Sequence, residues 1–532
     1  MIKKRLFRAL IATVTWVALT ATSSFGAGVQ VRTVHGMVEG ATSADGKVRI
    51  FEGIPFAAPP VGDLRWKEPQ PMPNWDGVRS AREFGARCMQ ADVFPDMVFR
   101  DKGPSEDCLY LNVWAPAADA SAKLPVMVWI YGGGFAAGAA SEPRQDGEHL
   151  AKKGVVVVSF NYRLGVFGFL AHPELAKESG HHAAGNYGLM DQTAALEWVQ
   201  KNIAAFGGDP AEVTIFGESA GSFSVNAQMA SPLTKGLFER AIGESGAFFG
   251  TSLPTKSLQN TEDAGRKFGE SIGAGSLAAL RAKPADELLK SASKYHDFRF
   301  APNIDGYFLP EDVYAIYAAG KQRSVPLLAG WNADEGSYKT IFGNEQPTLQ
   351  NYVARLHALF GEKADAVFKL YPAATDEQTK RSAQDLAGDQ FLGYATWKWI
   401  EMQSATGGAP VFRYHFEDAP PVSPTDKDPA AAAWRGAYHS SEIEFVFEDL
   451  ASKHLPWRTQ DHRLSEEISS YWTNFAKTGS PNGNGLPYWP AYTKQDGYQV
   501  MHLSPKLHAA ADAQRARYEL LDSMTSYEPA SK

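Results

Sequence analysis

Three continuous apolar runs stand out in the middle of the chain, at residues 126–131, 155–160 and 213–216. Runs of this length that are rich in β-branched residues are typical of strands buried on both faces, as in a parallel sheet. Between the second and third runs, residues 193–206 carry apolar side chains on one stripe, which predicts an amphipathic helix. The order strand, helix, strand predicts an α/β fold with a central, mostly parallel sheet flanked by helices.

Weaker patterns extend the predicted sheet in both directions. Residues 29–39 alternate apolar and polar positions, as a strand at an antiparallel edge does. Residues 325–329 and 411–414 predict two later strands, whereas residues 238–242 have a helical or mixed pattern. The predicted sheet therefore uses segments from most of the chain.

Long helical segments separate the later strands. Residues 253–322 and 344–405 are mostly helical in pattern, and we interpret them as insertions around a pocket rather than as a separate domain. Residues 464–476 form another amphipathic stretch, which ends in a basic turn followed by Gly479. Because no internal repeat or low-complexity linker divides the chain, we predict a single α/β domain over residues 28–532.

The beginning of the chain has the pattern of an export signal. A basic stretch precedes an apolar segment at residues 9–21, and small residues follow. This pattern predicts a cleaved signal peptide at residues 1–27, and hence a secreted or periplasmic protein with no integral membrane segment after cleavage. The alternative is an uncleaved anchor, although the apolar segment is short for a bilayer. The cleavage point is open, because Phe25 stands where a small residue is expected.

The charge balance argues against a nucleic-acid partner. The 52 Lys and Arg residues face 60 Asp and Glu residues, for a net charge of −8, and no long block of one sign occurs. A nucleic-acid-binding surface would instead be basic. We therefore expect a small-molecule partner, while the oligomeric state is not indicated by the sequence.

The two cysteines of the chain, Cys88 and Cys108, are close in sequence. In an exported protein such a pair is most simply one disulfide, which would stabilise the fold by roughly 3 kcal/mol if unstrained. Two unlinked buried thiols are the alternative. Two cysteines are too few for a structural zinc site of their own.

The strongest signal for chemistry is Gly-Glu-Ser-Ala-Gly at residues 217–221, between a predicted strand and a helical stretch. A serine on such a tight turn has a strained backbone, and glycines two residues away on each side let neighbouring elements approach it. The helix that follows offers backbone N–H groups to a developing negative charge. This pattern predicts that Ser219 is a nucleophile.

A second serine has a similar but poorer context. Ser245 has glycine two positions before it, but Ala247 stands two positions after it, and the preceding residues do not read as a strand. We expect Ser245 to be a structural residue near the pocket floor.

A run of glycines at residues 132–134 follows the first apolar strand. Consecutive glycines allow backbone N–H groups to face an oxyanion, which a serine nucleophile requires. The alternative is a nucleotide-binding loop. No Gly-Lys-Ser/Thr follows, however, and the spacing to Gly138 does not fit the dinucleotide fingerprint.

The residues alone leave the base and the acid open. In this kind of fold both follow the serine along the chain. Eight histidines are candidates for the base: His296, His357, His415, His439, His454, His462, His502 and His508. His439 lies in a turn-like stretch, which suits a catalytic loop. Asp334 and Glu335 both follow a predicted strand, and either could be the acid.

The chain resembles the type-B carboxylesterases, the carboxylesterase/cholinesterase family, over about residues 34–492. The resemblance rests on a series of motifs in the family's order. They are FEGIPFA at 51–57, SEDCLYLNV at 105–113, the glycine run, NYRLG at 161–165, GESAG at 217–221, NADEG at 332–336, His439 before EIEFVF at 442–447, and WTNF at 472–475. Such a set implies the α/β-hydrolase fold and a secreted serine carboxylic-ester hydrolase.

The resemblance also implies roles for single residues. The nucleophile is Ser219, the base is His439, and the acid is Glu335 rather than Asp334. The residues with implied supporting roles are the oxyanion donors Gly133, Gly134 and Ala220, the disulfide partners Cys88 and Cys108, and the buried acid Glu218. No metal or cofactor is implied. Ser440 and Ser441 depart from the family pattern, and the other disulfides of animal members are absent, so animal substrate preferences do not carry over.

The substrate pocket is the least determined part of the prediction. Candidate lining residues are Phe135, Phe248, Phe249 and Trp434, and Arg435 could receive an anionic acyl group. About half of such aromatic residues are ordinary core. An amidase or lactonase that uses the same triad is the second hypothesis, and a non-catalytic binding protein on the same fold is the third.

Overall fold

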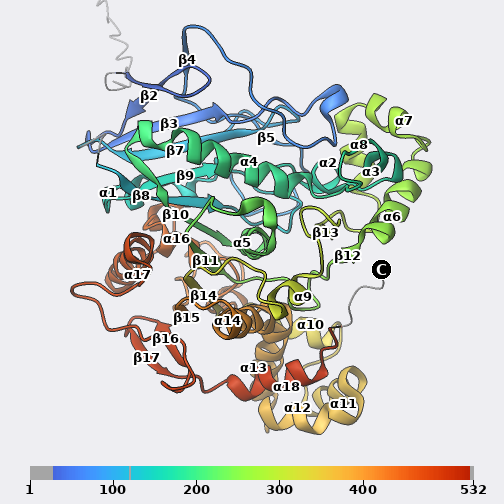
Figure 1. Cartoon of the computed structure of the whole chain (residues 1–532). Coiled ribbons are helices and arrows are strands. Elements are labelled where there is room, and N and C mark those ends of the chain that lie inside the picture. Colours follow the sequence, from blue (N-terminus) through green and yellow to red (C-terminus); the bar gives the residue numbers. More distant parts are fainter. Residues whose placement is uncertain (1–27, 119–121, 528–532) are drawn as a thin grey trace, which may run out of the picture.

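A computed structural model of the chain describes residues 28–118 and 122–527 (Figure 1). The predicted signal peptide at residues 1–27 lies outside the described residues. Within them, thirteen strands form one sheet. Its strands are β1 (Val29–Arg32), β2 (Met37–Thr42), β3 (Val48–Pro55), β4 (Val78–Ser80), β7 (Tyr110–Pro116), β8 (Leu124–Ile130), β9 (Val156–Phe160), β10 (Gly208–Glu218), β11 (Arg240–Glu244), β14 (Leu327–Asn332), β15 (Val411–Phe416), β16 (Gln499–Leu503) and β17 (His508–Ala511).

The sheet has the order β1-β2-β3-β7-β9-β8-β10-β11-β14-β15-β16-β17, and β4 pairs with β2. The strands from β9 through β16 are all parallel, and antiparallel pairs occur only toward the two edges of the sheet. The fold predicted from the apolar runs is therefore confirmed. The carboxyl ends of the parallel strands meet at one edge, where sites form in open α/β sheets.

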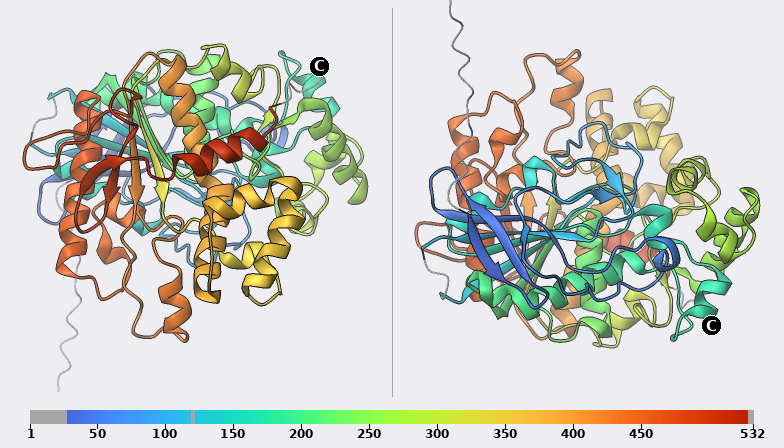
Figure 2. Two further views of the ribbon diagram at one scale, coloured as in Figure 1. Left: turned by 90° about the horizontal axis from the view of Figure 1, so that it is seen from below. Right: turned by 90° about the horizontal axis from the view of Figure 1, so that it is seen from above.

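Helices cover both faces of the sheet. Helices α4, α5 and α14 pack on one face, whereas α1 and α17 pack on the other (Figure 2). The helices are α1 (Glu148–Lys152), α2 (Gly165–Phe169), α3 (Pro173–Glu178), α4 (Tyr187–Asn202), α5 (Ala220–Ala230), α6 (Leu258–Ser271), α7 (Leu277–Ala282), α8 (Ala285–Ala292), α9 (Val313–Ala318), α10 (Tyr338–Phe342), α11 (Leu349–Phe360), α12 (Ala364–Leu370), α13 (Asp376–Gly388), α14 (Tyr394–Thr406), α15 (Pro429–Trp434), α16 (Ile443–Val446), α17 (Thr459–Thr478) and α18 (Arg515–Met524). Gly479 ends α17 in a left-handed conformation, as predicted.

The two long insertions are helical, as the sequence predicts. The first contributes α6 to α9, and the second contributes α11 to α14. Figure 1 shows α6, α7 and α8 in one group and α11 and α12 in another, both at the periphery of the sheet. A five-residue π-helix, Asp389–Gly393, joins α13 to α14. Single π-turns of this kind frequently occur at functional sites.

One prediction about the strands is wrong and another is confirmed. Residues 240–244 form β11, a central parallel strand, where the sequence has a helical or mixed pattern. Ala241 and Gly243 carry little strand preference, and pairing with strands on both sides determines the conformation. The antiparallel edge expected at residues 29–39 is confirmed, because β1 and the start of β2 lie there and pair antiparallel at one edge of the sheet.

The core contains the apolar strands together with several buried tryptophans, among them Trp114, Trp129 and Trp472. A second, smaller apolar cluster lies within the insertion and includes Tyr352, Leu356 and Leu386. Among the helices that the structure describes, none has the length and apolar character that a membrane crossing requires.

The predicted disulfide is present. Cys88 and Cys108 are bonded, and both residues are buried. Cys88 belongs to the short parallel pair β5 (Arg87–Cys88) and β6 (Pro104–Ser105). The bond closes a short loop just before β7, and it therefore limits the freedom of that loop in the unfolded chain.

Removal of this disulfide is expected to lower the free energy of unfolding by about 3 kcal/mol, because the unfolded chain regains the freedom of the closed loop. The double variant Cys88→Ala/Cys108→Ala avoids buried hydroxyl groups. Its thermal midpoint and that of the wild type would be measured with and without a reductant. We expect the reductant to lower the wild-type midpoint toward that of the variant and to leave the variant unchanged. Equal midpoints in all four samples would contradict the prediction.

Candidate active site

Ser219 stands at the junction of β10 and α5. Its backbone has φ 55° and ψ −122°, a conformation that residues with a side chain rarely adopt. The Ser219 N–H donates to the Glu244 carbonyl at the end of β11, 2.8 Å away, and its own carbonyl accepts from the Phe223 N–H. The strained turn is therefore held by hydrogen bonds on both sides.

The two glycines that flank the serine are required by close packing. A Cβ atom at either Gly217 or Gly221 would overlap the carbonyl oxygen of Ile130 at the end of β8. A Cβ atom at Gly132 would lie 2.9 Å from the Cβ of Ser219. The spacing of glycines in the sequence is therefore explained by the approach of β8 to the turn.

His439 and Glu335 complete a line of hydrogen bonds with Ser219. His439 Nε2 lies 2.9 Å from Ser219 Oγ, and His439 Nδ1 lies 2.7 Å from Glu335 Oε2. His439 lies in the loop between α15 and α16, and Glu335 follows β14. In the described part of the chain, no other histidine contacts the Ser219 hydroxyl. The three residues that the resemblance selects are therefore brought together in one line of hydrogen bonds.

Ser245 and Asn332 hold Glu335 in place. Ser245 Oγ and the Asn332 N–H both donate to Glu335 Oε1, the second at 2.8 Å. The other carboxylate oxygen remains directed at His439. Ser245 is thus structural, as expected, but it supports the acid rather than the pocket floor. The sequence did not predict β11, so the position of Ser245 at the end of this strand could not be predicted either.

Asp334 has a different environment from Glu335. Its carboxylate accepts hydrogen bonds from Arg381, from Gln384 and from the Ala437 N–H. These contacts tie the insertion to the loop that precedes His439. Asp334 therefore positions the loop, and of the two neighbouring acids only Glu335 reaches the imidazole.

The glycine run lies beside the serine. Gly133 has φ 105° and Gly134 has φ 64°, so both use backbone conformations that favour glycine. Both residues line the same cavity as Ser219, and so does Ala220. Among the described residues, the N–H groups of Gly133 and Gly134 have no acceptor. These N–H groups are therefore free to bind an oxygen of a ligand.

Buried carboxylates surround the imidazole. Glu218 Oε1 lies 3.3 Å from His439 Nε2. Burial raises the pKa of Glu218 to about 7, although His439 and Arg144 act in the opposite direction. Burial lowers the pKa of His439, but the charges of Glu218 and Glu335 outweigh burial and raise it above its ordinary value. The surroundings thus favour the protonated imidazole, which is the form that a base acquires during reaction.

The cavity at Ser219 has a volume of about 300 Å³. None of the predicted pocket residues lines it. Phe135 is fully buried against Phe169, and Phe248 is packed behind Phe223. Phe249 packs edge-on against Tyr317, and Trp434 faces Tyr338 outside the cavity. The walls come instead from other apolar residues: Phe94, Met97, Phe223, Leu253, Phe391, Leu392 and Ile443.

Phe391 is the cavity residue most directly connected to the base. It lies on the π-helix Asp389–Gly393, and its ring packs edge-on against the His439 ring, with centroids 5.6 Å apart. The side chain is 43% exposed, so it forms a boundary between the site and solvent. Its place could not be predicted from the sequence, because it depends on the wider turn of the π-helix.

Five ionisable side chains line the cavity, and Arg435 is not among them: Asp96, Arg144, Glu218, Arg299 and His439. Arg435 is exposed, pairs with Asp426 and does not line the cavity, so this prediction is wrong. Arg299 lines the cavity and donates to the Gly134 carbonyl at 2.8 Å. In the part of the chain that the structure describes, no carboxylate pairs with Arg299. Burial lowers the pKa of its guanidinium, which remains a cation at neutral pH.

Comparison with known proteins agrees with the resemblance that the sequence motifs indicate. A sequence model of the Carboxylesterase family matches residues 27–521. The fumonisin B1 esterase of Sphingopyxis macrogoltabida is 39% identical over 484 residues, which cover 87% of this chain and 84% of the relative. The para-nitrobenzyl esterase of Bacillus subtilis (strain 168) is 38% identical, with 87% and 93% covered. Carboxylesterase 5A of Canis lupus familiaris is 36% identical, with 92% and 88% covered.

The pH dependence of ester hydrolysis tests the charges around His439. A base must be neutral to accept a proton, so kcat/KM is expected to rise with pH through the pKa of His439, with a midpoint above 6.5. Glu218→Gln removes a neighbouring negative charge and should move this midpoint to lower pH by about one unit.

The matched control for this measurement is Glu244→Gln. Glu244 is a buried acid at the end of the adjacent strand, where it accepts a hydrogen bond from Trp472, and it does not contact His439. We expect its profile to coincide with that of the wild type. If Glu218→Gln left the midpoint unchanged, the assigned charge effect would be wrong.

Arg299 is expected to favour esters that carry a second, anionic group. Arg299→Ala should lower kcat/KM for mono-p-nitrophenyl succinate by about 10-fold relative to p-nitrophenyl butyrate, because a charged hydrogen-bond partner is lost. Arg435→Ala is the matched control and should leave the ratio of the two rates unchanged. Equal ratios in both variants would exclude this role for Arg299.

Proposed function

The chain belongs to the carboxylesterase family, and we propose that this hydrolase of ester bonds acts through an acyl-enzyme formed on Ser219. His439 is the general base, and Glu335 is the acid that orients it. We further propose that residues 28–532 form a single catalytic domain. The substrates of the family are small-molecule esters. The proposal concerns the residues that act on the ester and the order of the reaction steps.

One observation carries the proposal. The hydrogen bonds from Ser219 Oγ to His439 Nε2 and from His439 Nδ1 to Glu335 Oε2 form a continuous line. The serine end of this line opens into the cavity, and the glutamate end is buried among donors. Such an arrangement activates a hydroxyl group that is otherwise a weak nucleophile.

The proposed reaction has two halves. In the first, Ser219 Oγ attacks the ester carbonyl carbon while His439 accepts the hydroxyl proton, and Glu335 stabilises the imidazolium. The tetrahedral adduct collapses, the C–O bond to the alcohol breaks, and His439 gives its proton to the leaving oxygen. In the second half, a water molecule attacks the acyl-enzyme by the same steps and releases the carboxylic acid.

The oxyanion of each tetrahedral adduct needs hydrogen-bond donors. We assign this role to the backbone N–H groups of Gly133, Gly134 and Ala220. The free N–H groups at the two glycines support this assignment. Such donors contribute more to the transition state than to the ground state, because the negative charge develops only as the carbonyl is attacked.

The size and lining of the cavity support an acyl or alcohol group of moderate size that packs on the apolar walls and can direct an anionic end at Arg299. A volume of about 300 Å³ is at the lower end for small-molecule sites. The second hypothesis is an amidase or lactonase that uses the same three residues. Amides have a poorer leaving group, so the ratio of ester to amide turnover separates the two activities.

Export of the protein is a further part of the proposal. The signal-like pattern at residues 1–27 is the reason for it, and the buried Cys88–Cys108 bond supports it. Structural disulfides persist in oxidising compartments and are rare in the cytosol. We propose a secreted or periplasmic location on these grounds.

The decisive test uses Ser219→Ala and a series of p-nitrophenyl esters from C2 to C12. We expect kcat to fall by about 10⁶, because the base and the acid cannot act without the nucleophile. A serine-directed organophosphonate should label Ser219 in the wild type and fail to label the variant. The chain-length optimum of the wild type would define the acyl pocket.

Ser224→Ala is the control for this test. Ser224 lies on the same helix, where its hydroxyl donates to the Ala220 carbonyl, and it does not line the cavity. The control should keep most of the activity and the labelling. If Ser219→Ala retained substantial activity, the acyl-enzyme proposal would be overturned.

A further inference from the structure

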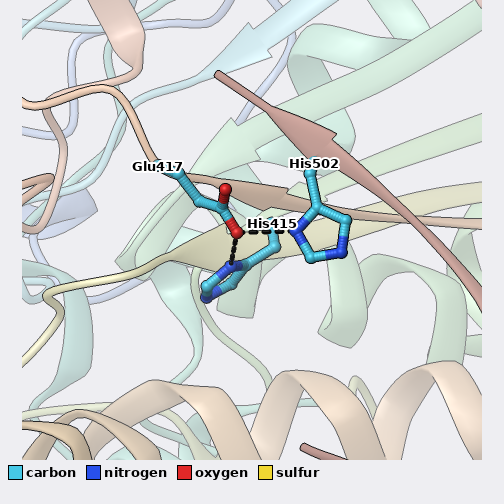
Figure 3. Close-up of side chains that lie close together, drawn as sticks. All are labelled: His415, Glu417 and His502. Carbon is cyan, nitrogen blue, oxygen red and sulfur yellow. Dashed lines mark hydrogen bonds and ion pairs between the residues drawn. The ribbon is translucent and has the colours of Figure 1, made fainter. Parts of the chain in front are cut away.

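A second group of reactive side chains lies away from the cavity, at the junction of β15 and β16. Figure 3 shows the rings of His415 and His502 turned toward the carboxylate of Glu417. His415 Nδ1 lies 2.9 Å from Glu417 Oε1, and His502 Nδ1 lies 2.6 Å from the same oxygen. None of the three residues lines the cavity at Ser219.

The register of the sheet places these three side chains together. His415 and His502 are paired residues of the parallel strands β15 and β16, so their side chains lie on the same face. Glu417 is two residues after His415 and therefore also lies on this face. Its N–H donates to the Leu503 carbonyl, which extends the ladder beyond the end of β15. The backbone of all three residues is thus fixed by strand pairing, and sites built on paired strands are well ordered.

The charge of Glu417 is compensated only by imidazoles. In the described ranges, its ion pairs are with His415 and His502, and no lysine or arginine pairs with it. The carboxylate oxygen Oε1 is directed at the Nδ1 atoms of both rings.

This donor set is suited to a metal ion. Two imidazole nitrogens and one carboxylate oxygen are typical ligands of zinc, and a site with three protein ligands keeps one position for water. The ligand atoms all lie within 4.8 Å of one another. In a tetrahedral zinc site they would be about 3.3 Å apart, so an outward movement of a few tenths of an ångström makes room for the ion.

The surroundings allow an ion to enter. The Glu417 side chain is 31% exposed and the His502 side chain is 23% exposed, whereas His415 is nearly buried. His415 also lines a separate cavity of about 220 Å³ next to Trp331 and Arg517. An ion can thus enter the site from solvent, and one of its ligands, His415, is fixed in the protein interior.

We propose that His415, Glu417 and His502 bind one divalent transition-metal ion of the zinc class. The ion joins β15 to β16 and holds the start of the segment that leads from Glu417 to the His439 loop. Since the folded chain binds the ion and the unfolded chain does not present this site, binding stabilises the fold. The role is structural, so ester hydrolysis does not require the ion.

The test uses the full-length exported protein after treatment with a chelator. Zinc is titrated against a chromophoric competitor, and cobalt is added in parallel, because its absorption spectrum reports tetrahedral coordination. We expect one ion per chain and a rise in the thermal midpoint of about 2–4 °C at saturating zinc. The rate of p-nitrophenyl ester hydrolysis is measured in the same samples and should be unchanged.

Three variants separate the site from its surroundings. His502→Ala and Glu417→Gln should weaken zinc binding at least about 10-fold and abolish the thermal shift. Glu417→Gln keeps the size of the side chain and therefore tests the proposal even if other variants fold poorly. The matched control is His508→Ala, since the His508 ring stacks on His502 with centroids 4.7 Å apart but is not a ligand.

The outcomes are distinct. Stoichiometric binding that is kept in His508→Ala and lost in the other two variants would support the site. Absence of stoichiometric binding to the wild type, or equal binding to His502→Ala, would overturn it. Loss of esterase activity in all samples would count against the proposed function and not against the metal site, because zinc binding is measured independently.

Discussion

The positive φ angle at Ser219 is maintained by the packing of β8 against the start of α5. A residue with a side chain does not stay in this conformation unless its surroundings prevent relaxation. Here the Ile130 carbonyl occupies the space next to both flanking glycines, and the Ser219 N–H is bound to the end of β11. The central parallel strands thus determine where the hydroxyl points. The glycine run and the His439 loop form a site only together with this turn.

The burial of several acids near one imidazole is the second constraint. Burial raises the pKa values of Glu218, Glu244 and Glu442 above the ordinary range of a carboxylic acid. Glu335 differs from them, because it accepts hydrogen bonds at both carboxylate oxygens in the described structure. Glu335 is thereby held as the acid that contacts His439 Nδ1. Differences of environment among similar groups often separate their roles in this way.

Local patterns predicted the apolar strands and the serine turn because both are short-range features of the chain. The base and the acid could not be found in this way, since His439 is 220 positions from Ser219 and 104 positions from Glu335. Only the resemblance to a family selected them, and their roles stay predictions. The aromatic residues chosen for the pocket failed: Phe135 directly follows the glycine run and Phe248 follows β11, but both side chains are buried in the core. Phe391 and Arg299 come from insertions, whose placement depends on tertiary packing.

The walls of the cavity and its reactive groups have different origins in the fold. Phe94 and Met97 belong to the loop closed by the disulfide, Arg299 to the first helical insertion, and Phe391 to the π-helix of the second. All three segments are inserted between strands of the sheet, and a change in their length leaves the strand register as it is. Selection can therefore act on the walls and on the reactive groups separately. Exchange of these peripheral segments would change which molecules fit the cavity, while the central strands would keep the turn at Ser219 in the same place.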